Sequence, residues 1–288
     1  MERNIFLLWL QGWDNAPWLQ KRVLHSWQIN NPQWKINLID QNNLTNYVND
    51  IEYIKDKKKK ISYQAKSDII RLSLLKNYGG VWADSTLLCM QPLESWVFEA
   101  LNPSGFWMYH GHGGGLNSDL GPASWFIVSE KKGYLITKWK DSCDDFWIKR
   151  TSIRNYFWMD GIFKKLIEKD PVFKKKWSKT PFLYCEKKGS SHTLANYNFT
   201  MHKNIDEVKT LIKEKPPYVL KLSSNFERTF NNLNNSIFKN SNVNFAIKMS
   251  TRKITFKHNT EKIISIPSPI KSKPFYKRIL KKILNKIL

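Results

Sequence analysis

The sequence is poor in cysteine. Its 288 residues include only Cys89, Cys143 and Cys185, which lie far apart and form no C-x-x-C pair. This spacing gives neither a disulfide framework nor a cysteine-based zinc site. Hydrophobic residues make up 41% of the chain, so a proper apolar core is available and global disorder is excluded. We therefore expect a folded protein of a reducing compartment.

Long apolar runs are also missing. No stretch approaches the ~20 apolar residues of a membrane-spanning helix. The run "IFLLWL" at residues 5–10 is short, follows an acid at Glu2, and precedes no small-residue cleavage site, so it is not read as a signal peptide. We expect a chain that is soluble or bound to a membrane surface. Its length suits one large domain with or without an appendage.

Acidic residues are scarce, with 24 Asp and Glu against 47 Lys and Arg and a formal net charge of +23. Such an excess indicates an anionic partner, which could be nucleic acid, membrane lipid or a phosphorylated substrate. Many lysines stand in clusters, as at residues 55–60 and 174–176. A solvated surface explains most of these, so the charge by itself does not choose among the partners.

The N-terminal region has the pattern of a β-α-β unit. Residues 4–12, "NIFLLWLQG", are apolar without alternation, which is typical of a strand covered on both faces in a parallel sheet. A helix follows, for which Asp14 or Asn15 can provide the cap. Residues 35–40, "KINLID", predict the second strand. We expect a right-handed crossover and a ligand site at the carboxyl ends of the strands.

The apolar stretch "SDIIRLSLLKNYGGVWADST", residues 67–86, contains Asp68, Arg71 and Asp84. The pattern predicts a helix over 62–78, a stop at the two glycines and a strand ending at Asp84. Asp68 and Arg71 share one face of a helix that is otherwise apolar nearly all round, so each needs the other or a polar ligand. A buried ion pair explains these two equally well. Asp84 favours a ligand site, because α/β folds place ligands where strands end.

This stretch resembles a known family. The pattern SD-x-x-R-x-x-x-L-x-x-x-GG-x-W-x-D-x-T is similar to the sugar-binding region of glycosyltransferase family 32 and its capsular polysaccharide synthesis branch. It is similar also to the glucosyltransferase domains of large clostridial toxins. Residues 11–17, 26–34 and 38–44 resemble the opening of the capsular branch. The resemblance covers residues 5–93 well and is patchy to about residue 225.

The resemblance implies an α/β fold of GT-A type, with a Rossmann-like mixed sheet and flanking helices. It also implies a nucleotide-sugar donor, UDP-linked, a divalent cation, Mn²⁺ or Mg²⁺, and retention of anomeric configuration. In this reading Asp68 and Arg71 hold the donor sugar. Asp84 is the first acid of the D-x-D motif, a catalytic residue and a metal ligand. Trp9 stacks on the base, with Phe6 as the alternative.

Thr86 departs from the broader family pattern, which has a second metal-binding acid at this position. Mg²⁺ and Mn²⁺ favour carboxylate oxygens, whereas Thr86 offers a neutral hydroxyl. The D-x-T form is common in the capsular branch and is compatible with activity. We expect substrate contact from Thr86 and a weakly held metal on Asp84, the diphosphate and water. Metal independence is the alternative.

Several further residues are candidates. Residues 154–169, "RNYFWMDGIFKKLIEK", predict a helix. Asp160 within it lies in an element resembling one of the family's acceptor-side segments and is a second catalytic candidate; the alternative is a solvated helix acid. Lys221 is a candidate to reach the donor diphosphate, or an ordinary surface lysine. His110 and His112 are expected in a glycine-rich acceptor loop. Asp40 ends the second strand and could face the nucleoside.

The C-terminal segment differs from the rest, with no acid after Glu261 and a Pro/Ser-containing linker. Residues 273–288 predict a basic amphipathic helix that lies on an anionic membrane surface. The alternative is a helix docked on the chain's own domain or on a second subunit. The apolar side of this helix would carry Phe275, Ile279, Ile283 and Ile287, and the basic side Arg278, Lys281 and Lys282.

Together these observations predict a GT-A-type domain over residues 1–262 and a linker with a membrane-surface helix over 263–288. The expected reaction moves a hexose from a nucleotide-diphosphate sugar to a hydroxyl of a growing capsular or surface polysaccharide. A lipid-linked acceptor at the inner, cytoplasmic face of a bacterial membrane fits this reading. The alternatives are a toxin-like protein glycosyltransferase, a non-catalytic glycan-binding protein and a nucleic-acid-binding protein. The last is disfavoured, because buried acids do not make an aromatic-basic platform.

Overall fold

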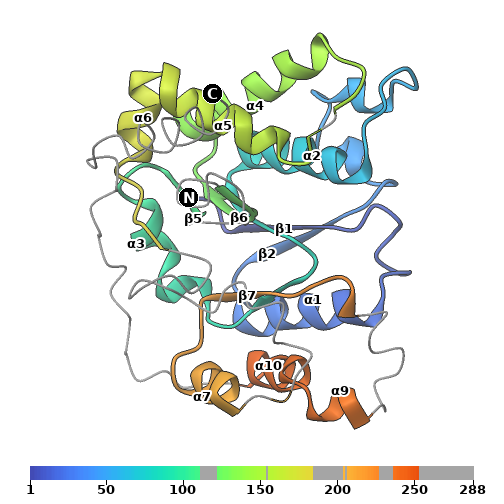
Figure 1. Ribbon diagram of the computed structural model, residues 1–288, viewed down its shortest axis with the longest axis vertical. Coiled ribbons are helices and arrows are strands. Elements are labelled where there is room, and N and C mark those ends of the chain that lie inside the picture. The colour runs from blue at the N-terminus through green and yellow to red at the C-terminus, as the bar shows by residue number, and fades with distance from the viewer. Residues whose placement is uncertain (111–121, 154, 184–203, 205, 227–235, 253–288) are drawn as a thin grey trace, which may run out of the picture.

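The structure is a computed structural model of the chain. It describes residues 1–110, 122–153, 155–183, 204, 206–226 and 236–252 (Figure 1).

A five-stranded sheet in the order β2-β1-β3-β6-β5 forms the centre of the molecule (Figure 1). Strand β1 pairs in parallel with β2 and β3, whereas β6 runs antiparallel to both β3 and β5. The sheet is therefore mixed, and the predicted α/β fold with a mixed sheet and flanking helices is confirmed. The strands are β1 (Asn4–Leu8), β2 (Lys35–Ile39), β3 (Gly80–Ala83), β5 (Phe106–His110) and β6 (Pro122–Ser129).

Helices cover both faces of this sheet (Figure 1). One face carries α2 (Tyr63–Tyr78), α4 (Tyr134–Ile148), α5 (Trp158–Lys169) and α6 (Pro171–Trp177). The other face carries α1 (Trp18–Asn30) and α3 (Val97–Leu101), with α7 (Asp206–Glu214), α9 (Ser236–Asn240) and α10 (Asn242–Ser250) beyond α1. Short 3₁₀ turns are formed by Leu44–Asn46, Glu52–Lys55 and Leu93–Ser95.

A second, two-stranded sheet lies beside α1 (Figure 1). It pairs β4 (Leu87–Cys89) with β7 (Val219–Lys221) in antiparallel orientation. Strand β4 follows β3 along the chain after a short turn, so this ribbon starts at the carboxyl end of β3. The pairing brings the C-terminal part of the described chain to the end of the central sheet where a ligand site is predicted.

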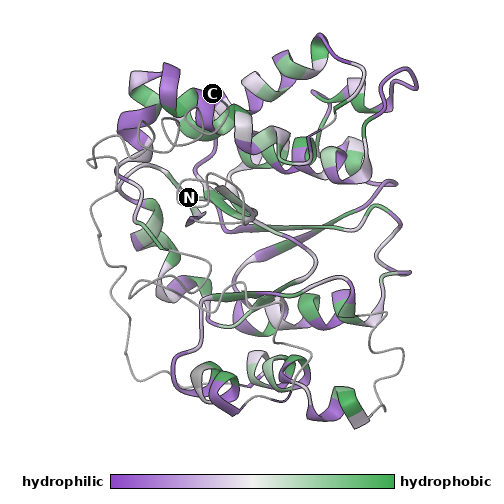
Figure 2. Ribbon diagram, viewed as in Figure 1, coloured by the Kyte–Doolittle hydropathy of each residue, from purple (hydrophilic) through white to green (hydrophobic). Residues whose placement is uncertain are grey.

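Strand β1 is buried on both faces, as its unbroken apolar pattern predicts. Ile5 and Leu7 belong to the apolar cluster on the α1 side of the sheet, and Phe6 and Leu8 to the cluster on the α2 side. Figure 2 shows hydrophilic residues along the outer sides of the helices. The parallel β1-α1-β2 unit is thus confirmed, and it holds the carboxyl end of β1 against two packed layers.

Helix α2 and strand β3 meet at two glycines. Ser62 caps the helix by accepting a hydrogen bond from the backbone N–H of Ala65. Gly79 ends the helix with φ +65°, and Gly80 opens β3 with φ +102°. A Cβ at Gly80 would lie 2.4 Å from the carbonyl oxygen of Asn4 in β1. The predicted glycine stop is confirmed, and it allows β3 to lie directly beside β1.

Two predicted helix starts are wrong. Helix α1 begins at Trp18, and its N-cap residue is Pro17. Neither Asp14 nor Asn15 caps it with a side-chain hydrogen bond. Helix α5, predicted to begin at residue 154, begins at Trp158, because residues 156 and 157 form a turn. In both places the apolar pattern begins before the first residue of the helix.

The predicted C-terminal segment, residues 263–288, lies outside the described residues, so the boundary at residue 262 stays a prediction. Within the described ranges, no helix combines the length and the apolarity that crossing a membrane requires.

Candidate donor-binding pocket

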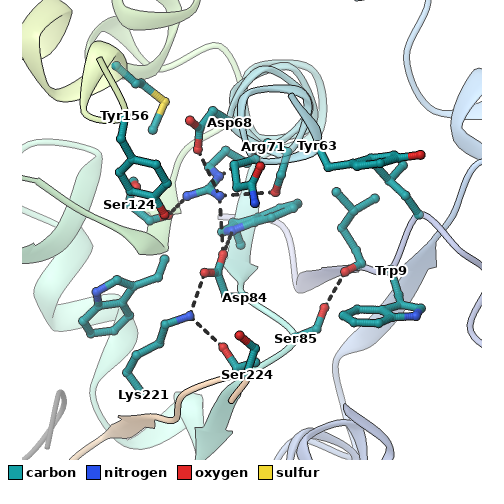
Figure 3. Close-up of a pocket in the computed structure, with 18 of the residues that line it drawn as sticks. Trp9, Tyr63, Asp68, Arg71, Asp84, Ser85, Ser124, Tyr156, Lys221 and Ser224 are labelled. Atoms are coloured by element: carbon teal, nitrogen blue, oxygen red, sulfur yellow. Dashed lines mark hydrogen bonds and ion pairs between the residues drawn. The ribbon is translucent and has the colours of Figure 1, made fainter. Parts of the chain in front are cut away.

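A pocket of about 370 Å³ opens at the carboxyl ends of β1 and β3, where the β-α-β pattern places a ligand site. Its size falls in the range of small-molecule sites, about 300–1,000 Å³. Figure 3 shows Asp68, Arg71, Asp84 and Lys221 in a row along the pocket, with Trp9 across from them. The structure therefore brings together residues from β1, α2, β3 and β7.

Arg71 links the two acids of the motif. Its Nη2 lies 3.2 Å from Oδ1 of Asp68 and 3.5 Å from Oδ1 of Asp84. Its Nη1 donates a hydrogen bond of 2.6 Å to the carbonyl oxygen of Ser124, and the guanidinium lies over the ring of Trp82. Arg71 is only 6% exposed. The predicted ion pair thus exists, but it is part of a network that reaches Asp84 and lines the pocket.

Lys221 completes this network from the other side. Its Nζ donates hydrogen bonds of 2.8 Å to Oδ2 of Asp84 and 2.7 Å to Oγ1 of Thr86. The pairing of β7 with β4 fixes this position, because Leu87 stands opposite Lys221 and the N–H of Leu222 donates to the carbonyl of Thr86. The alternative of an ordinary surface lysine does not fit a side chain that is 16% exposed and doubly bonded.

The pKa values of the two acids that contact Arg71 are shifted in opposite directions. Burial acts to raise the pKa of Asp84, but Lys221 and Arg71 outweigh it and hold that pKa below its ordinary value. Burial raises the pKa of Asp68 to about 6, although Arg71 opposes the rise. Asp84 is consequently ionised throughout the neutral range, and its charge is shared between two cations.

Asp160 lies in the first turn of α5 and lines the same pocket. Burial raises its pKa to about 7, and the negative charge of Asp68 adds to the rise while Arg71 opposes it. Trp158, from the same turn, donates a 3.1 Å hydrogen bond to Oδ2 of Asp68. The alternative of a fully solvated helix acid does not fit this position. A carboxyl group that titrates near neutral pH can exchange a proton with a substrate.

The raised pKa of Asp160 predicts a pH-dependent cost to stability. An acid whose pKa is higher in the folded state destabilises the fold increasingly as pH rises from the unfolded pKa to the folded pKa. The effect is complete above the folded pKa and absent below the unfolded one. We expect Asp160→Asn to raise the free energy of unfolding by about 2 kcal/mol at pH 8, allowing for solvent at this carboxyl, and by almost nothing at pH 3.5. Urea unfolding at both pH values measures this difference.

The matched control is Asp145→Asn, which neutralises an exposed carboxyl of α4. It should change the free energy of unfolding little at either pH. An Asp160→Asn protein that is no more stable than wild type at pH 8 would show that burial does not raise the pKa of Asp160 in the folded protein.

Aromatic side chains surround the pocket. Trp9 lines it, held by a hydrogen bond from its backbone N–H to the carbonyl of Ile39. Phe6, the alternative for base stacking, is 1% exposed and packs against Tyr78 in the core, so that assignment is wrong. Tyr63 and Tyr156 also line the pocket and are 66% and 70% exposed. Sequence reasoning missed both, although exposed aromatics beside a predicted helix start are a usable signal.

His110 does not lie in a glycine-rich acceptor loop. It ends β5 and is buried, with its ring centroid 4.5 Å from that of Trp177 and 4.1 Å from that of Phe182. Burial lowers its pKa to about 3, so it is neutral at physiological pH. The expected role of His110 is therefore wrong, and His112 lies outside the described residues.

Asp40 has a local structural role. Its Oδ1 accepts hydrogen bonds of 2.8 Å and 3.2 Å from the backbone N–H groups of Asn42 and Asn43, which shapes the turn after β2. It does not line the pocket. The prediction that Asp40 faces a nucleoside is therefore not supported, because its carboxylate bonds the backbone of its own turn outside the pocket.

The donor atoms at Asp84 and Thr86 do not fit a divalent cation. Both carboxylate oxygens of Asp84 are engaged, Oδ1 by Trp82 and Arg71 and Oδ2 by Lys221. The Thr86 hydroxyl accepts from the same ammonium. The described ranges contain no group of three or more His, Cys, Asp or Glu residues able to hold a metal. A positively charged ammonium between Asp84, the expected metal ligand, and Thr86 repels a metal ion.

Comparison with known proteins gives several relatives. Glycosyltransferase afumC of Aspergillus fumigatus (strain CBS 144.89 / FGSC A1163 / CEA10) is 29% identical over 110 residues, which is 34% of this chain and 28% of that protein. The O-glycosyltransferase PaGT of Phomopsis amygdali is 23% identical over 185 residues, 57% of this chain and 42% of that protein. The chain thus spans well under half the length of these curated relatives.

A solved structure, the PaToxG Glycosyltransferase, superposes with a TM-score of 0.40 at 14% identity, over 62% of this chain and 72% of that one. The family described as "Capsular polysaccharide synthesis protein" matches residues 1–241, which include every described pocket residue named above. Since this match extends over most of the 288 residues, the chain belongs to the capsular polysaccharide synthesis protein family.

Proposed function

We propose that this protein is a glycosyltransferase that moves a sugar from a nucleotide-diphosphate donor to a hydroxyl group. One observation carries the proposal: a pocket at the ends of β1 and β3 has acids and cations along one side and an aromatic side chain across from them. A nucleotide sugar needs hydrogen-bond acceptors for its hydroxyls, positive charge for its diphosphate and a flat surface for its base. The family and the named relatives, described as glycosyltransferases, support the same activity.

Each pocket residue has a role in this proposal. Trp9 stacks on the base, and Asp68 accepts hydrogen bonds from the donor sugar. Arg71 and Lys221 face the diphosphate, whose charge grows as the sugar departs. Asp84 holds both cations in place. Fixed charges of this kind stabilise a transition state without reorganising during the reaction.

Asp160 belongs to the acceptor side in this proposal. It lies near Asp68 on the wall formed by α5, next to the exposed ring of Tyr156. With a pKa near neutral, its carboxylate can take the proton of the attacking hydroxyl. Tyr156 offers an apolar face against which an acceptor sugar can stack.

The finer proposal is a hexosyltransferase, retaining, that extends a capsular or surface polysaccharide from a UDP-linked donor. Membership of the capsular polysaccharide synthesis family supports the capsular acceptor, and the similarity to the O-glycosyltransferase PaGT supports transfer to oxygen. Mn²⁺ or Mg²⁺ is the cofactor that the resemblance implies. Because the donor atoms at Asp84 and Thr86 do not fit it, no step of the reaction is assigned to a metal.

Donor hydrolysis tests the proposed activity. Purified protein is incubated with UDP-, GDP-, ADP- and CDP-linked sugars, and release of the nucleoside diphosphate is measured with and without Mn²⁺. We expect release from one nucleotide class, since water can replace the acceptor slowly. Absence of both hydrolysis and nucleotide binding across the whole panel would contradict the proposal.

We propose that residues 273–288, which lie outside the described residues, form a helix that holds the enzyme on an anionic membrane face near a lipid-linked acceptor. Each basic residue close to such a surface contributes about 1 kcal/mol of attraction, which salt weakens. We expect the full-length protein to float with liposomes containing anionic lipid at low salt, and a protein lacking residues 270–288 to remain soluble. Equal behaviour of the two proteins would favour the docked helix instead.

A further inference from the structure

We propose that the ammonium group of Lys221 takes the place of a divalent cation and neutralises the donor diphosphate, so that donor binding is independent of metal. This inference rests on the proposed function, because it assigns the charge that the diphosphate meets in the same pocket.

The position of Lys221 is the first argument. Its Nζ lies between Oδ2 of Asp84 and Oγ1 of Thr86, at 2.8 Å and 2.7 Å. These are the two side chains that would share a metal in a D-x-D site. The ammonium therefore lies where such a metal would sit, on the pocket wall and with part of its surface open.

The hydrogen-bonding capacity of the ammonium is the second argument. A lysine ammonium has three N–H donors and no acceptor. Two of them are directed to Asp84 and Thr86 among the described residues. The third is left for a ligand in the pocket, and a phosphate oxygen is a strong charged acceptor for it.

Thr86 then has a physical explanation. An acid at this position would put the ammonium of Lys221 between two carboxylates and cancel its charge. The hydroxyl of Thr86 accepts a hydrogen bond and orients the ammonium without neutralising it. The D-x-T form and Lys221 therefore belong together, as a one-carboxylate site for an organic cation.

The backbone holds this cation rigidly. Strand β7 pairs with β4, where Leu220 and Val219 stand opposite Leu88 and Cys89, and all four are buried. The N–H of Leu222 donates to the carbonyl of Thr86 at 2.9 Å. Lys221 is thus fixed before a donor arrives, which is what electrostatic stabilisation of a leaving group requires.

Nucleoside diphosphate binding tests the inference without relying on turnover. Binding of UDP is measured by isothermal titration calorimetry in EDTA and in Mn²⁺, with GDP, ADP and CDP in parallel. We expect the wild-type protein to bind the preferred diphosphate within about twofold under both conditions. Lys221→Met should bind it at least tenfold more weakly in EDTA, and Lys221→Arg should keep part of the affinity. Lys55→Met, which removes an exposed lysine paired with Glu52, is the charge control and should bind as wild type.

A double variant sharpens the test. Lys221→Met with Thr86→Asp removes the ammonium and supplies the second acid, so we expect it to bind the diphosphate at least tenfold more tightly in Mn²⁺ than in EDTA. Circular dichroism checks that each variant is folded, and the wild-type comparison of EDTA with Mn²⁺ decides the question even if a variant is not.

The outcomes are distinguishable. Wild-type binding that is lost in EDTA and restored by Mn²⁺ would overturn the inference and leave the proposed function standing. So would a folded Lys221→Met protein that binds as tightly as wild type in EDTA. If no nucleoside diphosphate binds with EDTA or with Mn²⁺, the inference fails, and the proposed function fails with it if no nucleotide sugar is hydrolysed either.

Discussion

The Asp84→Asn variant is expected to lose at least about 100-fold in the rate of sugar transfer or donor hydrolysis. Among the described residues, Asp84 is the one carboxylate that contacts both Lys221, at 2.8 Å, and Arg71, at 3.5 Å. An amide at this position keeps the shape but removes the charge that orders both cations. Donor hydrolysis and near-ultraviolet circular dichroism, measured on the same preparation, separate a loss of function from a loss of structure.

The same substitution should also lower stability, in a pH-dependent way. The pKa of Asp84 is held below its ordinary value in the folded state, because Lys221 and Arg71 outweigh burial. A depressed pKa contributes stability that is present above the unfolded pKa and lost as pH falls through the folded one. We therefore expect the variant to melt below wild type at pH 7 and the difference to shrink in acid.

The matched control for Asp84→Asn is Asp141→Asn, which removes one partner of a surface ion pair with Lys76. Exposed pairs contribute little, so both activity and melting temperature should stay near wild type. A folded Asp84→Asn protein with full turnover would rule out the role given to this carboxylate.

The Gly80→Ala variant is expected to lose about 3 kcal/mol or more of folding free energy. Gly80 has φ +102°, a conformation that residues with a side chain rarely adopt. Its new Cβ would also lie 2.4 Å from the carbonyl oxygen of Asn4, in the backbone of β1, which cannot move aside without breaking the sheet. Urea unfolding followed by circular dichroism gives the difference in free energy.

Gly161→Ala is the control for that variant. Gly161 lies inside α5, and a Cβ there would meet nothing within 4 Å. Alanine in place of glycine within a helix stabilises by about 1 kcal/mol, so the two Gly→Ala changes should have opposite signs. Equal stabilities for Gly80→Ala and wild type would mean that β1 and β3 are not held as closely as the structure places them.

Local patterns predicted much of the sheet and of α2. The unbroken apolar run of β1 and the all-round apolar helix ending in two glycines each carry their signal within about 20 residues. Asp68, Arg71 and Asp84 follow from the same stretch, because a charge in an apolar run must have a partner. Those parts of the fold and of the pocket were accessible from sequence because the residues that decide them are neighbours along the chain.

The remaining features depend on contacts between distant segments. Lys221 meets Asp84 across 137 positions of sequence, through the pairing of β7 with β4, and no local pattern encodes that pairing. His110 follows an apolar strand and precedes glycines, so its burial against Trp177 and Phe182 is invisible until α6 is packed. The predicted start of α5 was wrong for a similar reason. Tyr156 and Phe157 form a turn with exposed rings, but in the sequence they look like part of the apolar face of the helix.

The pairing of β7 with β4 has a consequence for the newly made chain. All five strands of the central sheet have been synthesised once Ser129 is added, whereas Lys221 follows roughly 5 to 20 s later at ordinary translation rates. During that interval Asp84 has Arg71 but not Lys221 as a counter-ion. A chain broken off before β7 would carry the whole sheet and yet lack Lys221, the cation proposed to meet the diphosphate. Under the proposed function, products of synthesis or proteolysis that end before β7 would therefore not consume nucleotide sugar, because β7 supplies Lys221 only after the whole central sheet has been made.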